Sequence, residues 1–445
     1  MDHPQDIRLF HADGILDAEG VCQAPGALLI EDSGDSLCVL ASGSPGEVAL
    51  HPAATGAVRV DCAGTILIPG LINAHTHLDL THVGPQPYDP VRGRFGDWLA
   101  MILRERATTD EAIRDSVRLG IDRSLAGGVV AVGDIAGVWS TVPTQTLRES
   151  PMAGVSFIEC FGVGAKQEDS ADRIRGIVDE IESETQGVRV GVSPHAPYTV
   201  GLRLYQRMLD LAGSKRLPIA THLAESDPER EFIADGTGLF HDLLESMGLW
   251  DESILDEVGE GQTPIGHFFS ELGTSVREAL EAAPILLVHC NDISDADLEL
   301  LTRAPVSVAY CPRGSVYFGA EHRFGPHRYA EMLECGINVA LGTDSVVNLP
   351  ESESGGAPTI STLDEIRFLH ARDSSVPARM LLKMATTNAA RALGLDPDRF
   401  TLAPGPIEGV VSVAVGAFSN ADQMATALAG SAGDPALLTL RTPAP

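Results

Sequence analysis

From Thr65 onward, short apolar runs rich in β-branched residues alternate with longer segments whose apolar residues recur at helical spacing. Short runs of this kind are typical of buried strands, and the longer periodic segments are typical of amphipathic helices. Eight runs predict strands at Ile66–Ile72, Val129–Val132, Val155–Ile158, Val188–Val192, Pro218–Ala220, Ile285–Val288, Val306–Ala309 and Ile337–Leu341. Helices are predicted between them, at Ile113–Leu125, Ile174–Ile181, Leu202–Ala212, Asp295–Leu301 and Tyr329–Leu333. Eight alternating strand–helix units predict an α/β fold, a (β/α)8 TIM barrel.

The two ends of the chain do not continue this alternation. Short candidate strands broken by glycine and aspartate lie at Ala27–Ile30, Leu37–Leu40 and Val58–Val60. After a loop at Pro350–Pro358, the sequence predicts a long helix at Pro377–Leu393, because proline suits a first helical position and Gly394 suits the position after the last turn. Strand and loop patterns then return to the end of the chain. We therefore expect residues 1–65 plus 400–445 to form one small β-sandwich domain beside a barrel at 66–399.

Charge and cysteine content restrict the partners and the compartment. The 445 residues include 62 acidic and 31 basic side chains, which gives a formal net charge of −31. This acidity excludes general nucleic-acid binding and argues against docking on anionic membranes. Seven scattered cysteines without a CxxC pair do not indicate a disulfide framework, and no signal peptide or membrane-spanning run is visible. We expect a cytoplasmic protein with a small-molecule ligand; the oligomeric state is open, and a homodimer is one option.

Candidate metal ligands follow the predicted strands, at the barrel end where active sites are built. His75 and His77 follow the first strand, and their spacing of two puts both imidazoles on the same side of it. His222 follows the fifth strand, His289 the sixth and Asp344 the eighth. Taken alone, the His-x-His pair is also compatible with two ordinary polar residues at a strand end. Together the residues predict a nitrogen and oxygen site suited to zinc, iron or another divalent transition metal.

Several segments carry a resemblance to a known family. Pro69–His77, His222–Glu225 and Gly342–Ser345 resemble the signature motifs of the amidohydrolase superfamily. Ser193–Tyr198 is similar to the fourth-strand motif of its nucleobase and nucleoside deaminase branch, which also holds the triazine chlorohydrolases. The motifs occur in family order, and the resemblance covers residues 20 to about 415. It implies a metal-dependent hydrolase built on the barrel.

The resemblance also implies a role for each candidate residue. His75, His77, His222 and Asp344 would bind one divalent metal ion, with zinc as the first expectation and iron or manganese as alternatives. His289 would hydrogen-bond the water or the substrate, Glu225 would move protons, and His195 would face the substrate pocket. The chemistry agrees, because a bound divalent cation lowers the pKa of its water toward about 7, Asp344 can accept a proton, and Glu225 can protonate a ring nitrogen. By position alone, Glu225 is also compatible with an acidic residue in the first turn of a surface helix.

Lysine positions bear on the number of metal ions. Binuclear members of the superfamily generally bridge two metals with a carboxylated lysine from the fourth strand. This chain has only three lysines, and none lies between residues 167 and 214, where the fourth strand ends in His195. The sequence therefore predicts a mononuclear site. Glu159 follows the third strand and is either close enough to bind a second metal or a structural residue. We expect the structural role.

Other residues bear on the substrate. Segments at 77–81, 95–99, 311–313 and 317–319 resemble the aminodeoxyfutalosine and related adenosine-type deaminases, although Gly314 and Ser315 replace the Ser-Asn that often follows there. Trp98 is a candidate lid over the pocket or a helix-packing residue. Arg313 is a candidate partner for a substrate carboxylate or hydroxyl group, or a salt bridge at the barrel rim.

These observations predict hydrolytic deamination of an aminopurine nucleoside or a related aminated heterocycle by a metal-activated water. One alternative changes the leaving group and makes the protein a chlorohydrolase or an amide/imine hydrolase. The other is a catalytically inactive scaffold, which the complete set of candidate residues opposes. The substrate, the metal and the arrangement of residues 226–284 stay open.

Overall fold

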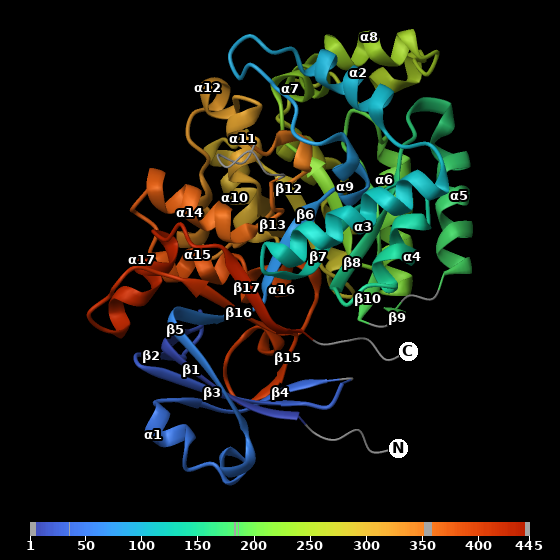
Figure 1. Cartoon of the computed structure of the whole chain (residues 1–445). Coiled ribbons are helices and arrows are strands. Elements are labelled where there is room, and N and C mark those ends of the chain that lie inside the picture. Colours follow the sequence, from blue (N-terminus) through green and yellow to red (C-terminus); the bar gives the residue numbers. More distant parts are fainter. Residues whose placement is uncertain (1–5, 35, 182–183, 186, 351–357, 441–445) are drawn as a thin grey trace.

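The computed structural model describes residues 6–34, 36–181, 184–185, 187–350 and 358–440. Parallel strands form a nearly closed barrel, and a second sheet, built from both ends of the chain, lies on one side of it (Figure 1). The predicted TIM barrel with a small β domain from both termini is therefore confirmed. The loop predicted at Pro350–Pro358 lies for the most part outside the described residues.

The barrel strands follow one another in chain order, and each is parallel to its neighbours. They are β6 (Leu71–Thr76), β7 (Val129–Val138), β8 (Ala153–Cys160), β10 (Val188–Pro194), β11 (Ile219–Leu223), β12 (Ile285–His289), β13 (Ser307–Tyr310) and β14 (Asn338–Leu341). The short strand β9 (Glu184–Thr185) pairs antiparallel with β10. A parallel bridge between Thr76 and Asp344 joins the end of the first strand to the end of the last. The carboxyl ends of all eight strands consequently meet at one end of the barrel.

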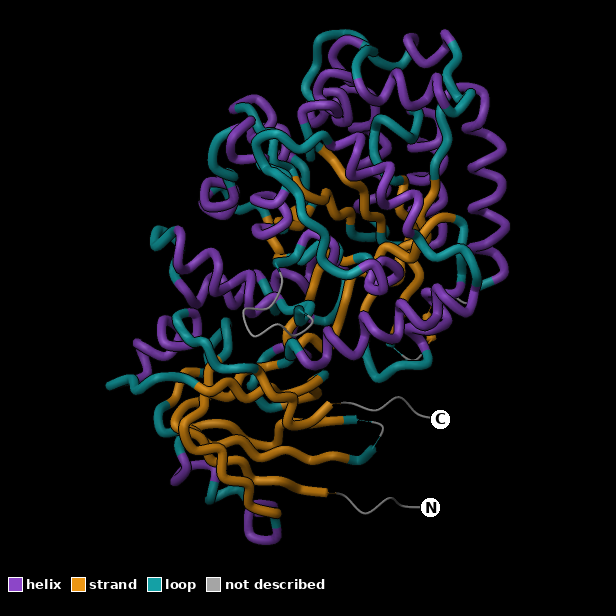
Figure 2. The backbone as a smooth tube through the Cα atoms, turned by 45° about the horizontal axis from the view of Figure 1, so that its top comes forward, coloured by secondary structure: helices purple, strands orange, loops and turns teal. Residues whose placement is uncertain are grey.

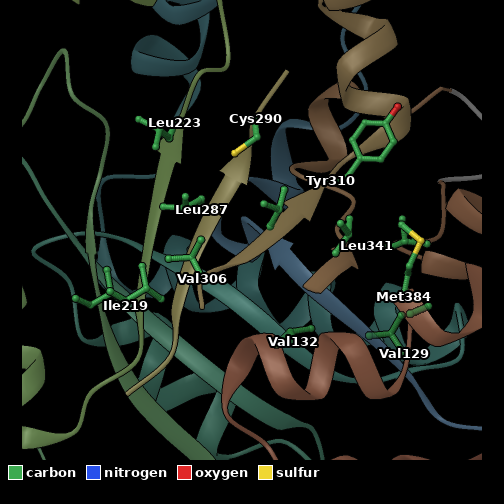
Figure 3. Packing of buried hydrophobic residues seen from close by; sticks show 14 of the residues in the cluster. Val129, Val132, Ile219, Leu223, Leu287, Cys290, Val306, Tyr310, Leu341 and Met384 are labelled. Carbon is green, nitrogen blue, oxygen red and sulfur yellow. The ribbon is translucent and has the colours of Figure 1, made fainter. Parts of the chain in front are cut away.

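Alternation along each strand divides the barrel core into two layers. Leu287, Val308 and Val339 belong to the large cluster that packs against the surrounding helices, and Figure 3 shows part of this cluster. Ala309 follows Val308 in β13 and Ala340 follows Val339 in β14, and both alanines belong to a second cluster. Successive side chains of a strand point to opposite faces, so this second cluster fills the barrel interior. The alanines of this cluster let helix α16 (Thr387–Leu393) close the amino-terminal end of the barrel.

Helices cover the outside of the barrel, as the tube in Figure 2 shows. Between the strands lie α3 (Asp110–Ala126), α4 (Val142–Arg148), α5 (Gln167–Glu180), α6 (Leu202–Lys215), α9 (Pro264–Leu280), α10 (Asp295–Arg303), α11 (Pro312–Tyr317), α12 (Ala320–Phe324), α13 (Tyr329–Glu334) and α14 (Thr362–Arg372). The segment 226–284, left open by the sequence, contains α7 (Asp227–Asp235), α8 (Leu239–Ser246) and α9. With α2 (Phe95–Glu105), helices α7 and α8 lie on the side of the barrel away from the terminal sheet (Figure 1). None of the described helices is both long and apolar enough to cross a membrane.

The terminal sheet is one continuous, curled sheet with the strand order β15-β4-β3-β1-β5-β16-β17, and β2 pairs with β1. Its strands are β1 (Asp6–Leu16), β2 (Cys22–Gln23), β3 (Gly26–Asp32), β4 (Leu37–Gly43), β5 (Val58–Pro69), β15 (Gly405–Ile407), β16 (Gly409–Ala414) and β17 (Pro435–Leu440). Two short α-helices of the described residues, α1 (Pro45–Val48) and α17 (Met424–Ala429), also belong to this part, and neither was predicted. The domain boundaries expected from the sequence stay a prediction.

The predicted strand Ile66–Ile72 is wrong, because the chain changes sheets within it. Strand β5 continues to Pro69 in the terminal sheet, and β6 begins at Leu71 in the barrel. Proline has no N–H to donate, and the next two N–H groups donate to different segments: Gly70 to Gly409 O at 2.8 Å and Leu71 to Gly128 O at 3.0 Å. An added Cβ at Gly70 would lie 2.5 Å from the Val130 side chain, so glycine permits this close crossing.

The predicted helix Pro377–Leu393 is also wrong as a single element. It is divided into α15 (Ala378–Met384) and α16 (Thr387–Leu393), and Pro377 precedes the first helical residue. The carbonyl oxygen of Ala385 accepts a hydrogen bond from the Ile72 N–H at 2.8 Å, so this carbonyl serves strand β6 rather than a continuous helix. Gly394 ends α16 with a φ of 67°, as its position predicted.

Candidate active site

The carboxyl ends of the strands bring the predicted metal ligands together. His75 is the fifth residue of β6, His77 follows that strand, His222 lies in β11, and Asp344 comes after β14. The ring centroids of His75 and His77 are 4.9 Å apart, and those of His75 and His222 are 5.0 Å apart. Asp344 Oδ1 lies 3.7 Å from His75 Nε2 and 3.5 Å from His77 Nε2. One nitrogen from each of the three histidines falls within 4.8 Å of the others, which suits a single ion.

Unsatisfied nitrogen atoms show that this set fits a divalent cation. The His75 side chain is fully buried, and neither of its ring nitrogens has a hydrogen-bond partner among the described residues. Burial lowers the pKa of His75 to about 3 and that of His222 to about 4, so both rings are neutral at pH 7 and have a lone pair to give. His222 Nδ1 donates to the His195 carbonyl oxygen at 3.0 Å, which leaves Nε2 for a metal. Buried polar atoms without partners are rare, and an ion would satisfy these.

Backbone geometry at the strand ends is unusual. Ala224, His289, Cys290 and Asp344 have φ values of 55°, 73°, 50° and 57°, in the left-handed region that residues other than glycine seldom adopt. Each lies at the end of a barrel strand, beside the ligand set. Such conformations persist where the surrounding structure enforces them, and they are concentrated at functional sites.

Glu225 and His289 face each other beside the ligands. Glu225 Oε1 lies 3.5 Å from His289 Nε2, and both side chains are buried, so the surface-helix interpretation of Glu225 is wrong. Burial raises the pKa of Glu225 well above its usual value, and the carboxylate of Asp344 raises it further. Burial lowers the pKa of His289 well below its usual value. A carboxyl group with a raised pKa therefore lies next to an imidazole with a lowered pKa, so a proton on this pair favours the carboxyl group.

A cavity of about 480 Å³ opens onto these residues. Its walls are mostly apolar, and helices α2 and α8 supply Trp98, Leu99, Ile102, Leu243 and Leu244. The Trp98 ring also packs against Phe318, with ring centroids 4.9 Å apart, so it serves both as a pocket wall and in helix packing. The segment 226–284 and α2, which the strand–helix alternation did not define, thus supply part of the pocket wall.

His195 and Glu159 line the same cavity, on the side of β8 and β10. His195 Nδ1 shares a hydrogen bond of 2.7 Å with Thr199 Oγ1, so its Nε2 is left for the pocket, as the resemblance implied. Glu159 Oε1 lies 4.0 Å from His195 Nε2, and Glu159 Oε2 lies 3.9 Å from Arg106 Nη2. Burial raises the pKa of Glu159 to about 7 although Arg106 opposes the rise. Arg106 has no motif around it and was not predicted; it is fixed by Nε and Nη2 hydrogen bonds to Asp79 Oδ2.

Arg313 is not placed to bind a substrate in the cavity. Its Nε donates to Glu365 Oε1 at 2.6 Å, its backbone N–H donates to Glu365 Oε2 at 3.1 Å, and its Nη2 donates to Ser361 O at 3.3 Å. Glu365 is fully buried, so its carboxylate requires this partner. Arg313 does not belong to the described cavity lining, and the salt-bridge interpretation replaces the substrate-binding one.

Comparisons with known proteins agree with the geometry. Residues 66–407 match the model of the amidohydrolase family. An aminodeoxyfutalosine deaminase of Deinococcus radiodurans is 27% identical over 398 residues, which cover 87% of this chain and 86% of that protein. A 5-methylthioadenosine/S-adenosylhomocysteine deaminase of Pyrococcus furiosus is 26% identical over 370 residues, which cover 78% of this chain and 75% of that protein.

Solved structures share the whole architecture. The aminofutalosine deaminase of Helicobacter pylori in complex with methylthio-coformycin has a TM-score of 0.73 and 20% identity, over 96% of this chain and 97% of that one. A zinc complex of the atrazine chlorohydrolase of Arthrobacter aurescens has a TM-score of 0.67 and 20% identity, over 94% of this chain and 90% of that one. Deaminases and a chlorohydrolase share this fold, so the fold alone does not choose between the two reactions.

Proposed function

The chain belongs to the amidohydrolase family, and we propose that it removes an amino group by hydrolysis from an adenosine-type nucleoside. The observation that carries this proposal is the buried pair Glu225–His289 beside the ligand set, because replacing a ring amino group needs a proton donor next to the attacking water. The relatives reported above are named as deaminases. One of them is named for 5-methylthioadenosine and S-adenosylhomocysteine, and both of these compounds contain an adenosine unit. A cytoplasmic location and a small-molecule substrate are part of the same proposal.

Within this proposal, one zinc ion is held by His75, His77, His222 and Asp344. A second group, made of Glu159, His195 and His222, also brings three possible ligand atoms within 4.8 Å of one another. This group shares His222, whose Nδ1 already donates to a carbonyl, so its Nε2 serves one ion only. The guanidinium of Arg106 also lies 3.9 Å from Glu159 and repels a second cation there. Both facts support a single ion.

The chain's own residues supply the proton transfers. When bound, the ion acts as a Lewis acid and lowers the pKa of a water molecule toward about 7. Asp344 accepts a proton from this water, and neutral His289 hydrogen-bonds the attacking oxygen. Glu225 in its protonated form gives a proton to the ring nitrogen next to the reacting carbon. Asp344 then gives its proton to the amino group, the C–N bond breaks and ammonia leaves. The proton of the added hydroxyl returns to Glu225, so the ring keeps the oxygen as a carbonyl group.

Two basic residues at the mouth of the cavity favour a substrate with a negatively charged extension. Lys166 and Arg173 line the cavity, and neither forms an ion pair with a described residue. The Arg173 guanidinium lies 4.7 Å from the centre of the Trp139 ring, which holds it at the mouth. In a chain with twice as many acidic as basic residues, two unpaired cations at one opening indicate attraction of an anionic group.

An ammonia-release assay on the zinc-loaded protein tests the function. The panel contains adenosine, 5′-methylthioadenosine, S-adenosylhomocysteine, guanine, cytosine and a chlorinated triazine. We expect ammonia from adenosine derivatives and its loss in Glu225→Gln, which keeps the side-chain shape but cannot give up a proton. The control is Glu231→Gln, an exposed position on helix α7. Chloride release alone would favour the chlorohydrolase alternative, and no turnover of any compound would favour an inactive scaffold.

A further inference from the structure

All backbone polar groups of Ala224 and Glu225 are hydrogen-bonded to two other segments. The N–H groups of Ala224 and Glu225 donate to Glu229 Oε1 at 2.9 Å and Glu229 Oε2 at 2.7 Å. The Ala224 carbonyl oxygen accepts from the Asn291 and Asp292 N–H groups at 2.9 and 3.0 Å. The Glu225 carbonyl oxygen accepts from Asn291 Nδ2 at 3.1 Å. Ala224 holds a left-handed φ of 55° inside this frame, so the frame maintains a conformation that the residue alone disfavours.

Glu229 matches its two donors with two acceptors. It lies in the first turn of α7, is fully buried, and directs its carboxylate back toward the end of β11. An ionised carboxylate has only acceptor sites, so both oxygens can receive an N–H. A glutamine at this position would offer one oxygen and place an NH₂ group against the second N–H donor. The two N–H donors therefore favour the charged form of Glu229, although burial raises its pKa to about 7. A side chain of the same length without two acceptor oxygens does not replace it.

Asn291 is held in turn by Ser315. The Ser315 hydroxyl donates to Asn291 Oδ1 at 3.1 Å, which orients the amide so that Nδ2 faces the Glu225 carbonyl oxygen. Both side chains are buried. Ser315 belongs to the Gly314-Ser315 pair that replaces the Ser-Asn often found in the resembled branch. An added Cβ at Gly314 would lie 2.8 Å from Asn348 Nδ2, so the departure fits the packing of this chain.

We propose that Glu229, Asn291 and Ser315 are positioning residues that hold the Glu225 carboxyl group against His289. Glu229 fixes the N–H side of the Glu225 backbone, and Asn291, oriented by Ser315, fixes its carbonyl side. This inference rests on the proposed function in one respect, namely that Glu225 is the proton donor. A misplacement of about 1 Å at a reacting group costs about 100-fold in rate, so the frame contributes to turnover without touching the substrate.

The test compares Glu229→Gln with Glu231→Gln, which makes the same substitution at an exposed position on the same helix. Amide hydrogen exchange of the zinc-loaded protein, followed on peptides that contain residues 223–226, measures the frame without any turnover. We expect faster exchange at Ala224 and Glu225 in Glu229→Gln and unchanged exchange in Glu231→Gln. Ser315→Ala, which removes one hydroxyl, is the milder second variant and should loosen the same peptides less.

Kinetics decide whether the frame acts on catalysis. For Glu229→Gln we expect kcat to fall about 10- to 100-fold, with KM within about twofold and bound zinc unchanged. Coformycin, an analogue of the tetrahedral state, should bind more weakly by about the same factor, because both depend on the position of Glu225. Unchanged exchange overturns the frame, and faster exchange with unchanged kcat and coformycin affinity overturns the positioning role. If the wild type deaminates nothing and does not bind coformycin, the positioning role fails together with the proposed function, whereas the exchange data still judge the frame by itself.

Discussion

The backbone N–H of Asp344 donates a hydrogen bond of 3.1 Å to the carbonyl oxygen of His75. The Thr76 hydroxyl adds a second bond of 3.1 Å to the Asp344 carbonyl oxygen, and the two bonds join the first barrel strand to the end of the last. The Asp344 carboxylate meanwhile lies 3.7 Å from His75 Nε2. The contact that closes the barrel therefore also brings two candidate metal ligands, 269 positions apart in the sequence, next to each other.

Barrel closure and metal binding separate in the variant Asp344→Asn. The closing hydrogen bonds use backbone atoms of Asp344, so we expect far-UV circular dichroism to match the wild type. Loss of the carboxylate charge should reduce zinc affinity and lower turnover by more than about 100-fold. A loss of about 100-fold is the most that is typical for residues that only hydrogen-bond a metal ligand. Elemental analysis and the ammonia assay measure the two effects. Asp256→Asn, at an exposed position, is the control. Full zinc content with normal turnover would remove Asp344 from the site.

Chelation should reveal one ion per chain. Removing an ion that binds only the folded protein lowers the unfolding free energy by about 4 kcal/mol when its free concentration is about 1,000 times Kd. We therefore expect a lower Tm and no turnover after dialysis against a chelator, and recovery of both with one equivalent of zinc. Glu159→Gln should bind the same single equivalent. Two equivalents in the wild type and one in this variant would show instead that Glu159 holds a second ion.

The strand–helix alternation and the strand-end histidines were predictable because both are local in the sequence. Apolar runs mark buried strands, and a barrel places every residue that follows a strand at the same end. The exchange of sheets at Pro69–Gly70 was not predictable, because its cause is the partner that each N–H finds. The same applies to the break at Ala385, whose carbonyl oxygen bonds to Ile72, 313 positions earlier in the chain.

The polar residues in and around the site also divide into those that the local sequence predicts and those whose role depends on distant residues. His195 was expected from its motif, whereas no sequence motif around Arg106 or Glu229 indicates their roles. Their importance comes from burial against distant groups: Arg106 binds Asp79, and Glu229 receives the backbone N–H groups beside Glu225. Arg313 shows the reverse case, because a buried acid 52 positions later takes a cation that looked suited to a substrate.

Asp134 should make stability depend on pH. Burial raises its pKa to about 8 and Asp79 adds to the rise, although the Leu78 N–H and Arg106 oppose it. Between about pH 4 and pH 8 the folded state keeps a proton that the unfolded state has lost, so stability falls as pH rises through this window. The slope from one proton is at most about 1.4 kcal/mol per pH unit.

The matching variant is Asp134→Asn, which can still accept the Leu78 N–H but cannot titrate. We expect its Tm, relative to that of the wild type, to rise between pH 5 and pH 8. Asp122→Asn, at an exposed position on α3, should keep the wild-type profile. Parallel Tm profiles for Asp134→Asn and the wild type would show that Asp134 is already ionised throughout this range.

Charge at the cavity mouth should decide between neutral and anionic substrates. Arg173 lines the cavity, forms no ion pair with a described residue and rests on the Trp139 ring. Because an exposed cation acts mainly through attraction at moderate distance, we expect Arg173→Ala to lower kcat/KM for an anionic substrate such as S-adenosine-5′-thiopropionate about three- to tenfold at low salt. The kcat/KM for 5′-methylthioadenosine, which has no charge on its extension, should stay within about twofold of the wild-type value.

The control is Arg175→Ala, at an exposed position on the same helix, which should change kcat/KM for neither substrate. Since salt screens exposed charges, the difference should shrink at about 1 M salt; an equal loss for both substrates would mean that Arg173 supports the pocket wall and does not select charge.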